Sequence, residues 1–304
     1  MPRVLVTGAS GLLGFAMVRA ARARGWTVTA ALRSHTAELL AAVRRPIEIV
    51  AHDLAITSAL AALVAETRPD AIIHTGAMSR PDECAANPAL AKAVNVEATR
   101  ALAIAAHERG AHFVFTSSDL VYGVNEATLF EDSSAPAPLG VYAATKLAAE
   151  QAALDATDGQ ATIARLGLLY GWGTGAHQCF AEEWLAALQR GKPVRAFTDQ
   201  FRRALYAEDA AAMLLALADS RKPGVYNVCG PELTSRYEFA LQLARTFGCN
   251  LTLVQRAQQA DFGYADPRPS RLDLSTTKLA SAIGWEASPP ERGLRRMAMR
   301  QRLP

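Results

Sequence analysis

The sequence predicts an α/β protein built on a doubly wound parallel sheet of the Rossmann type, with a second, smaller and discontinuous α/β domain for substrate. Through the first 170 residues, short apolar runs alternate with segments of helical period. The apolar runs are continuous rather than alternating with polar residues, which is typical of strands buried on both faces of a parallel sheet. The first run also leads directly into a glycine-rich turn and a helix, as in dinucleotide-binding folds.

The expected elements follow this alternation along the chain. Strands are predicted at Val4–Thr7, Thr27–Leu32, Ile47–Ala51, Ala71–Thr75, Phe113–Thr116, Ala161–Leu169 and Gly224–Val228. Helices are predicted at Leu12–Arg24, Ala37–Arg44, Ser58–Thr67, Ala89–Arg109, Val141–Ala156 and Tyr206–Ala218. Strands that alternate with helices in this way imply right-handed crossovers between parallel neighbours.

The rhythm changes after Tyr170, where the glycine-rich run Gly171–Gly175 begins and the later segments are less regular. We expect the last predicted helix and strand to return to the first sheet. The predicted Rossmann domain therefore comprises residues 1–170 and 203–228, and the predicted substrate-binding domain comprises residues 171–202 and 229–304.

Composition narrows the class of protein. The chain of 304 residues is 50% hydrophobic and carries 32 Lys and Arg against 29 Asp and Glu, so it can form a core and gives no support to a nucleic-acid partner. No apolar window is long enough for a transmembrane helix, and we expect no membrane partner. The opening segment lacks the apolar core of a signal peptide, and four scattered cysteines indicate reduced thiols, so we expect a cytoplasmic protein. The histidines form no metal-binding motif, and we expect no metal.

The glycine-rich turn after the first strand carries Gly8, Gly11 and Gly14. The first glycine permits the tight turn, the second lets the backbone approach a pyrophosphate, and the third lets the helix pack close to the strand. The phosphates of a dinucleotide then lie at the helix N-terminus. Its place between a strand and a helix makes this motif a predicted dinucleotide site rather than a packing turn.

The end of the second strand bears on the choice of cofactor. An NAD-preferring fold usually has an acidic residue there for the ribose 2′-hydroxyl, whereas this chain has Arg33 and Ser34, which suit a 2′-phosphate. We therefore expect NADP(H) as the preferred cofactor, with NAD(H) as the alternative. Asp53, after the third strand, has two open interpretations: it accepts a hydrogen bond from the adenine amino group, or it caps the helix near Ser58.

Three residues form a predicted catalytic set. Tyr142 and Lys146 are four residues apart, which places both side chains on one face of a helix. A neighbouring ammonium group lowers the pKa of a tyrosine toward neutrality, so Tyr142 is predicted to act as a general acid or base. Ser118 ends a strand at the sheet edge where open α/β folds bind ligands, and it is expected to hydrogen-bond a substrate carbonyl beside Tyr142.

Together these pieces resemble the extended short-chain dehydrogenase/reductase family, and within it most closely the dTDP-4-dehydrorhamnose reductase, or sugar-nucleotide reductase, group. The likeness covers the full length of the chain. The matching segments are Thr7–Gly14, Asp82–Pro88 leading to Asn95, Ser117–Asp119, Tyr142–Lys146, Arg165–Gly171, Asp199–Asp209, Arg268–Pro269 and Leu272–Asp273.

The resemblance implies an activity and further site residues. It implies NADPH-dependent reduction of a keto group, most closely the 4-keto group of a nucleotide-linked deoxysugar, with Lys146 also holding the nicotinamide ribose. Substrate contacts are expected from Asp119, from Arg202 on the sugar-nucleotide phosphates, and from Arg271. The further cofactor contacts are expected from Thr7, Ser10, Leu12, Leu13, Leu54, Gly76, Ala77, Asn95 and Tyr142.

Departures from related patterns keep two alternatives open. Sugar-nucleotide 4,6-dehydratases carry Asp-Glu where this chain has Asp119 and Leu120, so the base for an elimination is missing. The segment Arg165–Gly171 has Leu168 where UDP-sugar epimerases typically have Asn. An NAD(P)-dependent epimerase and a non-catalytic NADP-binding regulatory subunit remain the alternatives, and a homodimer is the oligomer considered.

Overall fold

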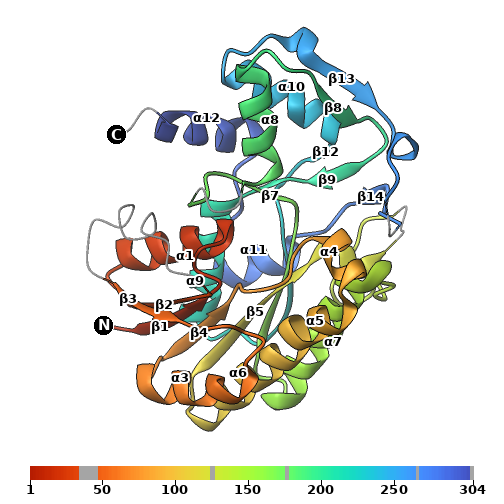
Figure 1. Ribbon diagram of the computed structural model, residues 1–304. Coiled ribbons are helices and arrows are strands. Elements are labelled where there is room, and N and C mark those ends of the chain that lie inside the picture. Colours follow the sequence, from red (N-terminus) through yellow and green to blue (C-terminus); the bar gives the residue numbers. More distant parts are fainter. Residues whose placement is uncertain (34–46, 124–126, 175–177, 265–266, 302–304) are drawn as a thin grey trace.

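A seven-stranded parallel sheet forms the centre of the computed structural model, which describes residues 1–33, 47–123, 127–174, 178–264 and 267–301 (Figure 1). The strand order is β11-β6-β5-β4-β1-β2-β3, and every neighbouring pair is parallel. The chain order reverses between β1 and β4, so the ligand crevice of a doubly wound sheet lies at the carboxyl ends of these two strands. The strands are β1 (Arg3–Thr7), β2 (Thr27–Leu32), β3 (Glu48–Ala51), β4 (Ala71–His74), β5 (His112–Ser118), β6 (Thr162–Leu166) and β11 (Gly224–Val228).

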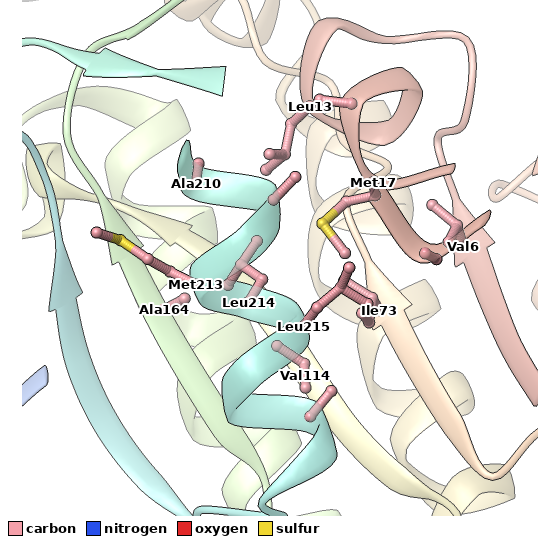
Figure 2. Close-up of a cluster of buried hydrophobic side chains, with 14 of the residues drawn as sticks. Val6, Leu13, Met17, Ile73, Val114, Ala164, Ala210, Met213, Leu214 and Leu215 are labelled. Carbon is pink, nitrogen blue, oxygen red and sulfur yellow. The ribbon is translucent and has the colours of Figure 1, made fainter. Parts of the chain in front are cut away.

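Helices cover both faces of this sheet, which confirms the predicted doubly wound architecture. On one face, α1 (Leu12–Ala23), α9 (Ala207–Asp219) and α11 (Thr277–Ile283) bury apolar side chains against the strands. Figure 2 shows Met17 of α1 and Leu214 of α9 within this layer. The other face is covered by α3 (Leu60–Thr67), α6 (Ala98–Glu108) and α7 (Gly140–Ala156).

Two predicted elements differ from the structure. The strand predicted at Ala161–Leu169 ends at Leu166, and Gly167 then passes so close to the carbonyl oxygen of Arg203 that a Cβ there would lie 2.5 Å from it. Residues Leu169–Tyr170 form β7, which pairs with β10 (Leu205–Tyr206) outside the main sheet.

The long helix predicted at Ala89–Arg109 is divided into three parts. It consists of α5 (Pro88–Lys92), a π-helical turn at Ala93–Glu97 and α6. The helix predicted at Ala37–Arg44 lies outside the described residues.

A second region lies above the carboxyl edge of the sheet (Figure 1). Its small sheets have the orders β12-β9-β14 and β13-β8, and an aromatic cluster that includes Tyr170, Tyr206 and Phe239 forms part of its core. The predicted domain boundary between residues 202 and 203 falls inside β9. The elements are α8 (Phe180–Gln189), β8 (Val194–Phe197), β9 (Phe201–Arg203), β12 (Leu233–Ser235), α10 (Arg236–Thr246), β13 (Val254–Ala257), β14 (Arg271–Leu272) and α12 (Pro290–Gln301).

The remaining elements are short. The structure adds α4 (Pro81–Ala86) and 3₁₀ helices at Thr57–Ala59, Asp119–Tyr122, Leu251–Leu253 and Gln259–Asp261. Within the described part of the chain, no helix is both long enough and apolar enough to cross a bilayer.

Candidate active site

Three glycines bring the ends of β1 and β4 into close contact. Gly8 has a φ of +67°, and a Cβ placed on it would lie 2.5 Å from the Cα of Gly76. A Cβ on Gly76 would lie 2.5 Å from the Cδ1 of Leu54, and a Cβ on Gly14 would collide with the carbonyl oxygen of Gly8. Gly8 and Gly14 therefore exclude a side chain, because a Cβ there meets backbone atoms, whereas at Gly76 the end of the Leu54 side chain would have to move. Gly8 and Gly11 are partly accessible at the switch-point crevice, and main chain without side chains at such a place is what a dinucleotide pyrophosphate requires.

The first helix is open to an anion at its N-terminus. Gly11 is the N-cap of α1, no side chain makes a capping hydrogen bond there, and the first turn, which begins with Leu12 and Leu13, holds no acidic residue. The glycine-rich turn is also held by a residue that follows β7: the Thr174 hydroxyl donates to the carbonyl of Ser10 at 2.8 Å. The orphan amides and the helix dipole suit a pyrophosphate, so the residues present fit a dinucleotide.

A chain of buried hydrogen-bonded side chains runs from this loop to α7. The Thr7 hydroxyl lies 2.5 Å from Nδ1 of His74, and Nε2 of His74 lies 3.1 Å from the Thr99 hydroxyl. Thr99 donates to the carbonyl of Asn95. The Asn95 amide in turn bonds both main-chain groups of Met78 and donates to the Thr145 hydroxyl at 3.0 Å. Burial lowers the pKa of His74 to about 3, so this imidazole is neutral and acts as a fixed hydrogen-bonding group.

The π-helical turn places Asn95 within this chain of hydrogen bonds, and such turns occur often at functional sites. Its amide nitrogen donates to both Met78 and Thr145, so the structure gives Asn95 a role in holding the loop after β4 against α7. Direct contact between Asn95 and a cofactor stays a prediction.

The predicted adenosine contacts lie at the ends of β2 and β3. Arg33 is exposed immediately after β2, and Ser34 lies outside the described residues. The Asp53 carboxylate accepts from the amide of Ala55 at 2.9 Å, and the helical turn at Thr57 has no side-chain cap. The helix-capping alternative for Asp53 is therefore wrong, because its carboxylate closes a local turn instead. Half-buried Ala77 follows the glycine of the β4 end.

Ser118 and Tyr142 meet at the carboxyl end of β5. Ser118 caps the 3₁₀ helix that follows: its hydroxyl accepts from the amide of Leu120 at 3.2 Å and donates to Asp119 at 3.3 Å. The Ser118 hydroxyl also forms a hydrogen bond with Tyr142, which reaches this point from the first turn of α7. Lys146 lies one turn further along α7, where it is buried with its Nζ 4.0 Å from the ring centre of Phe115.

The direction of the Tyr142 pKa corrects one expectation. Burial raises this pKa above its ordinary value, and the Asp119 carboxylate raises it further, although the hydrogen bond with Ser118 lowers it. Burial also lowers the pKa of Lys146 to about 7, against the opposing effect of Glu150. The prediction that Lys146 brings the Tyr142 pKa toward neutrality is wrong, because desolvation dominates and weakens the charge on the lysine itself.

A buried ion pair connects α7 with β6. The guanidinium of Arg165, on β6, donates to both carboxylate oxygens of Glu150, with an Nη2–Oε2 distance of 2.7 Å. The Ser117 hydroxyl donates to the same carboxylate at 2.5 Å. Because Glu150 lies one turn after Lys146, this network fixes the orientation of α7 relative to β5 and β6.

The predicted substrate residues have different surroundings. Arg202 is buried on β9 and donates to the carbonyls of Phe201 and Pro269 at 2.7 and 2.6 Å. Burial raises the pKa of Asp119 to about 6, and the charge on Arg202 opposes this shift, so these two predicted groups are neighbours. Arg271 instead forms an ion pair with Asp273 at 2.9 Å, which reduces its value as an anion-binding group.

Two arginines near this site were not predicted as site residues, although Arg268 lies in one of the segments that match the family. Arg236 is the first residue of α10, and Arg268 precedes β14; both interact electrostatically with Arg202. The Ser-x-x-Glu capping box at Ser235–Glu238 marks the start of α10 in the sequence. That signal locates the helix start, but it does not show that α10 begins beside Arg202.

Comparison with known proteins agrees with this geometry. The sequence matches the family described as the RmlD substrate binding domain over residues 2–302. It is 30% identical to dTDP-4-dehydrorhamnose reductase of Streptomyces griseus, over 92% of this chain and 88% of that protein. It is also 30% identical to methionine adenosyltransferase 2 subunit beta of Xenopus tropicalis, over 96% of this chain and 86% of that protein.

A solved structure shares the fold. The crystal structure of dTDP-4-dehydrorhamnose reductase from Bacillus anthracis in complex with NADP superposes with a TM-score of 0.83 at 24% identity, covering 98% of this chain and 99% of that one. The resemblance predicted from the sequence is confirmed. This chain belongs to the RmlD substrate-binding domain family and is an oxidoreductase of the extended short-chain dehydrogenase/reductase type.

Proposed function

We propose that this protein uses NADPH to reduce a keto group, the 4-keto group of a nucleotide-linked deoxysugar. The observation that carries the proposal is the hydrogen bond between Ser118 and Tyr142 at the carboxyl edge of the sheet, within electrostatic reach of Arg202 through Asp119. A proton donor and a buried cation that can bind an anion thus lie close together. The similarity to a reductase of a dTDP-linked keto sugar supports this substrate class.

The glycine-rich turn between β1 and α1 is the part of the site that suits the cofactor. The main chain at Gly8–Gly14 and the N-terminus of α1 would hold its pyrophosphate, and Arg33 would contact the 2′-phosphate that distinguishes NADPH from NADH. When bound, the reduced nicotinamide supplies a hydride for the carbonyl carbon of the substrate.

The protonation state of Tyr142 suits reduction. Because burial raises its pKa, the phenol keeps its proton at neutral pH and can donate it to the oxygen that becomes the alcohol. Ser118 would orient that oxygen through its hydroxyl. Lys146 lies on the same face of α7, where its ammonium would hold the nicotinamide ribose and stabilise the phenolate left after proton transfer.

On the substrate side, Arg202 would contact the diphosphate. Its guanidinium is oriented in advance by main-chain carbonyls of Phe201 and Pro269, so little side-chain freedom is lost on binding. Asp119 lies between Arg202 and Ser118 and would contact the sugar. Positive charge near the diphosphate and a proton donor near the keto group define the two ends of the substrate.

The test is Tyr142→Phe, assayed with NADPH and a panel of dTDP-, UDP- and GDP-linked 4-keto sugars. Loss of the phenolic proton donor should reduce kcat by about 10²–10⁴-fold, while the Kd for NADPH stays near that of the wild type. Tyr237→Phe, a half-buried tyrosine on α10, is the matched control and should keep full activity.

Two results would contradict the proposal. Wild-type protein that binds NADPH but reduces none of these sugars would favour a cofactor-binding subunit without turnover. Interconversion of sugar nucleotides without net consumption of NADPH would favour an epimerase.

A further inference from the structure

Three arginines that are far apart in the sequence, Arg202, Arg236 and Arg268, lie close together on the Asp119 side of the candidate site. Antiparallel pairing of β9 with β12 sets Arg202 opposite Thr234, two residues before Arg236. Parallel pairing of β14 with β9 sets Leu272 opposite Arg202 and brings the preceding segment, with Arg268, to the same place. The three-stranded sheet thus brings together positive charges that no single sequence motif contains.

Arg236 has an environment that is unusual for a guanidinium. Its Cζ lies 3.8 Å from the ring centre of Phe180 and 4.7 Å from that of Trp184, both on α8. Its Nε is buried and has no hydrogen-bond partner, and in the described part of the chain no carboxylate forms an ion pair with Arg236. The aromatic rings therefore fix a cation whose hydrogen-bonding capacity is not fully used.

Electrostatic repulsion makes this cluster costly. Burial, together with the charges on Arg202 and Arg268, lowers the pKa of Arg236 to about 9. Arg268 is compensated by an ion pair with Asp82 at 3.1 Å, whereas Arg202 has only the longer-range attraction of Asp119. In the described part of the chain Arg202 and Arg236 form no ion pair, and two neighbouring, desolvated cations of this kind indicate a site that an anion completes.

We propose that Arg236 is a substrate-binding residue that acts with Arg202 on the diphosphate of a nucleotide-linked substrate and selects a diphosphate over a monophosphate. This inference rests on the proposed function and extends it to a residue outside the predicted site. Two separate guanidiniums match the charge of two phosphoryl groups, whereas a monophosphate engages one of them.

The experiment measures nucleotide binding without turnover. Protein saturated with NADP⁺, so that the cofactor's own phosphate site is filled, is titrated calorimetrically with dTDP, UDP and their monophosphates. Arg236→Gln should raise the Kd of the diphosphates by about ten- to hundredfold, the loss expected for one charge-assisted contact. The Kd of the monophosphates should change far less.

Arg245→Gln is the matched control, because it removes the same charge from the exposed face of the same helix. Arg236→Lys keeps the charge and should recover part of the diphosphate affinity. Arg236→Met keeps an apolar stem against Phe180 and Trp184 and replaces the glutamine variant if that variant does not fold.

A diphosphate Kd that is unchanged in Arg236→Gln, or changed equally in Arg245→Gln, would overturn the inference. If instead the proposed reductase activity is wrong, the two assays give a different combination of results. In that case no keto sugar is reduced by the wild type, yet Arg236→Gln still loses affinity for dTDP.

Discussion

Replacing Glu150 by Gln tests whether the buried ion pair below the catalytic helix supports the site. Glu150 and Arg165 are joined at 2.7 Å, with side chains that are only 3% and 6% exposed. The substitution removes the negative charge but hardly changes the volume. Since arginine does not lose its proton in proteins, Arg165 is left as an unpaired buried cation. Breaking such a pair by removing one partner costs about 3–5 kcal/mol.

Urea unfolding followed by circular dichroism measures this loss. Asp261→Asn provides the control, because it breaks an ion pair with Arg195 at 3.1 Å whose side chains are about half exposed, and such pairs contribute about 0–1 kcal/mol. The double variant Glu150→Leu with Arg165→Met should recover most of the lost stability, because it removes both buried charges.

The reasoning also predicts an effect in the active site. Glu150 raises the pKa of Lys146, so Glu150→Gln should lower that pKa further below about 7 and shift the pH dependence of turnover toward lower pH. A stability within about 1 kcal/mol of the wild type would refute the assignment of Glu150 as the counterion that Arg165 requires.

Two further predictions concern Asp119 and Arg33. The folded-state pKa of Asp119 is about 6, above its ordinary value of 3.8. Ionisation of this carboxyl therefore destabilises the fold, and the destabilisation grows as pH rises from about 4 to 6 and is complete above that range. Asp119→Asn should therefore stabilise the fold by up to about 3 kcal/mol at pH 8 and by little at pH 4, and a difference in urea unfolding that is the same at both pH values would contradict this account. Arg33→Ala should raise the Kd for NADPH by about ten- to hundredfold and leave the Kd for NADH unchanged in fluorescence titrations, whereas equal wild-type affinities for the two cofactors would show that Arg33 does not select NADPH.

The sequence by itself determined the features that depend on near neighbours. The glycine turn could be predicted because Gly8, Gly11 and Gly14 lie within one strand–turn–helix unit, whose geometry permits few residue types. Tyr142 and Lys146 could be placed on one helical face by their spacing alone. The continuous apolar runs likewise indicated a parallel sheet, because strands buried on both faces need no polar side.

The tertiary structure decided what depends on burial and on distant partners. The direction of the Tyr142 pKa follows from desolvation by elements that pack around it, and spacing along one helix does not contain that information. The ion pair between Arg271 and Asp273, which makes Arg271 less available to an anion, joins residues only two apart. It bears on the site only because β14 pairs with β9, the strand that carries Arg202. Arg236 lies near Arg202 because pairing in a three-stranded sheet brings its helix start there, and long-range register of this kind is set by the packing of the whole domain.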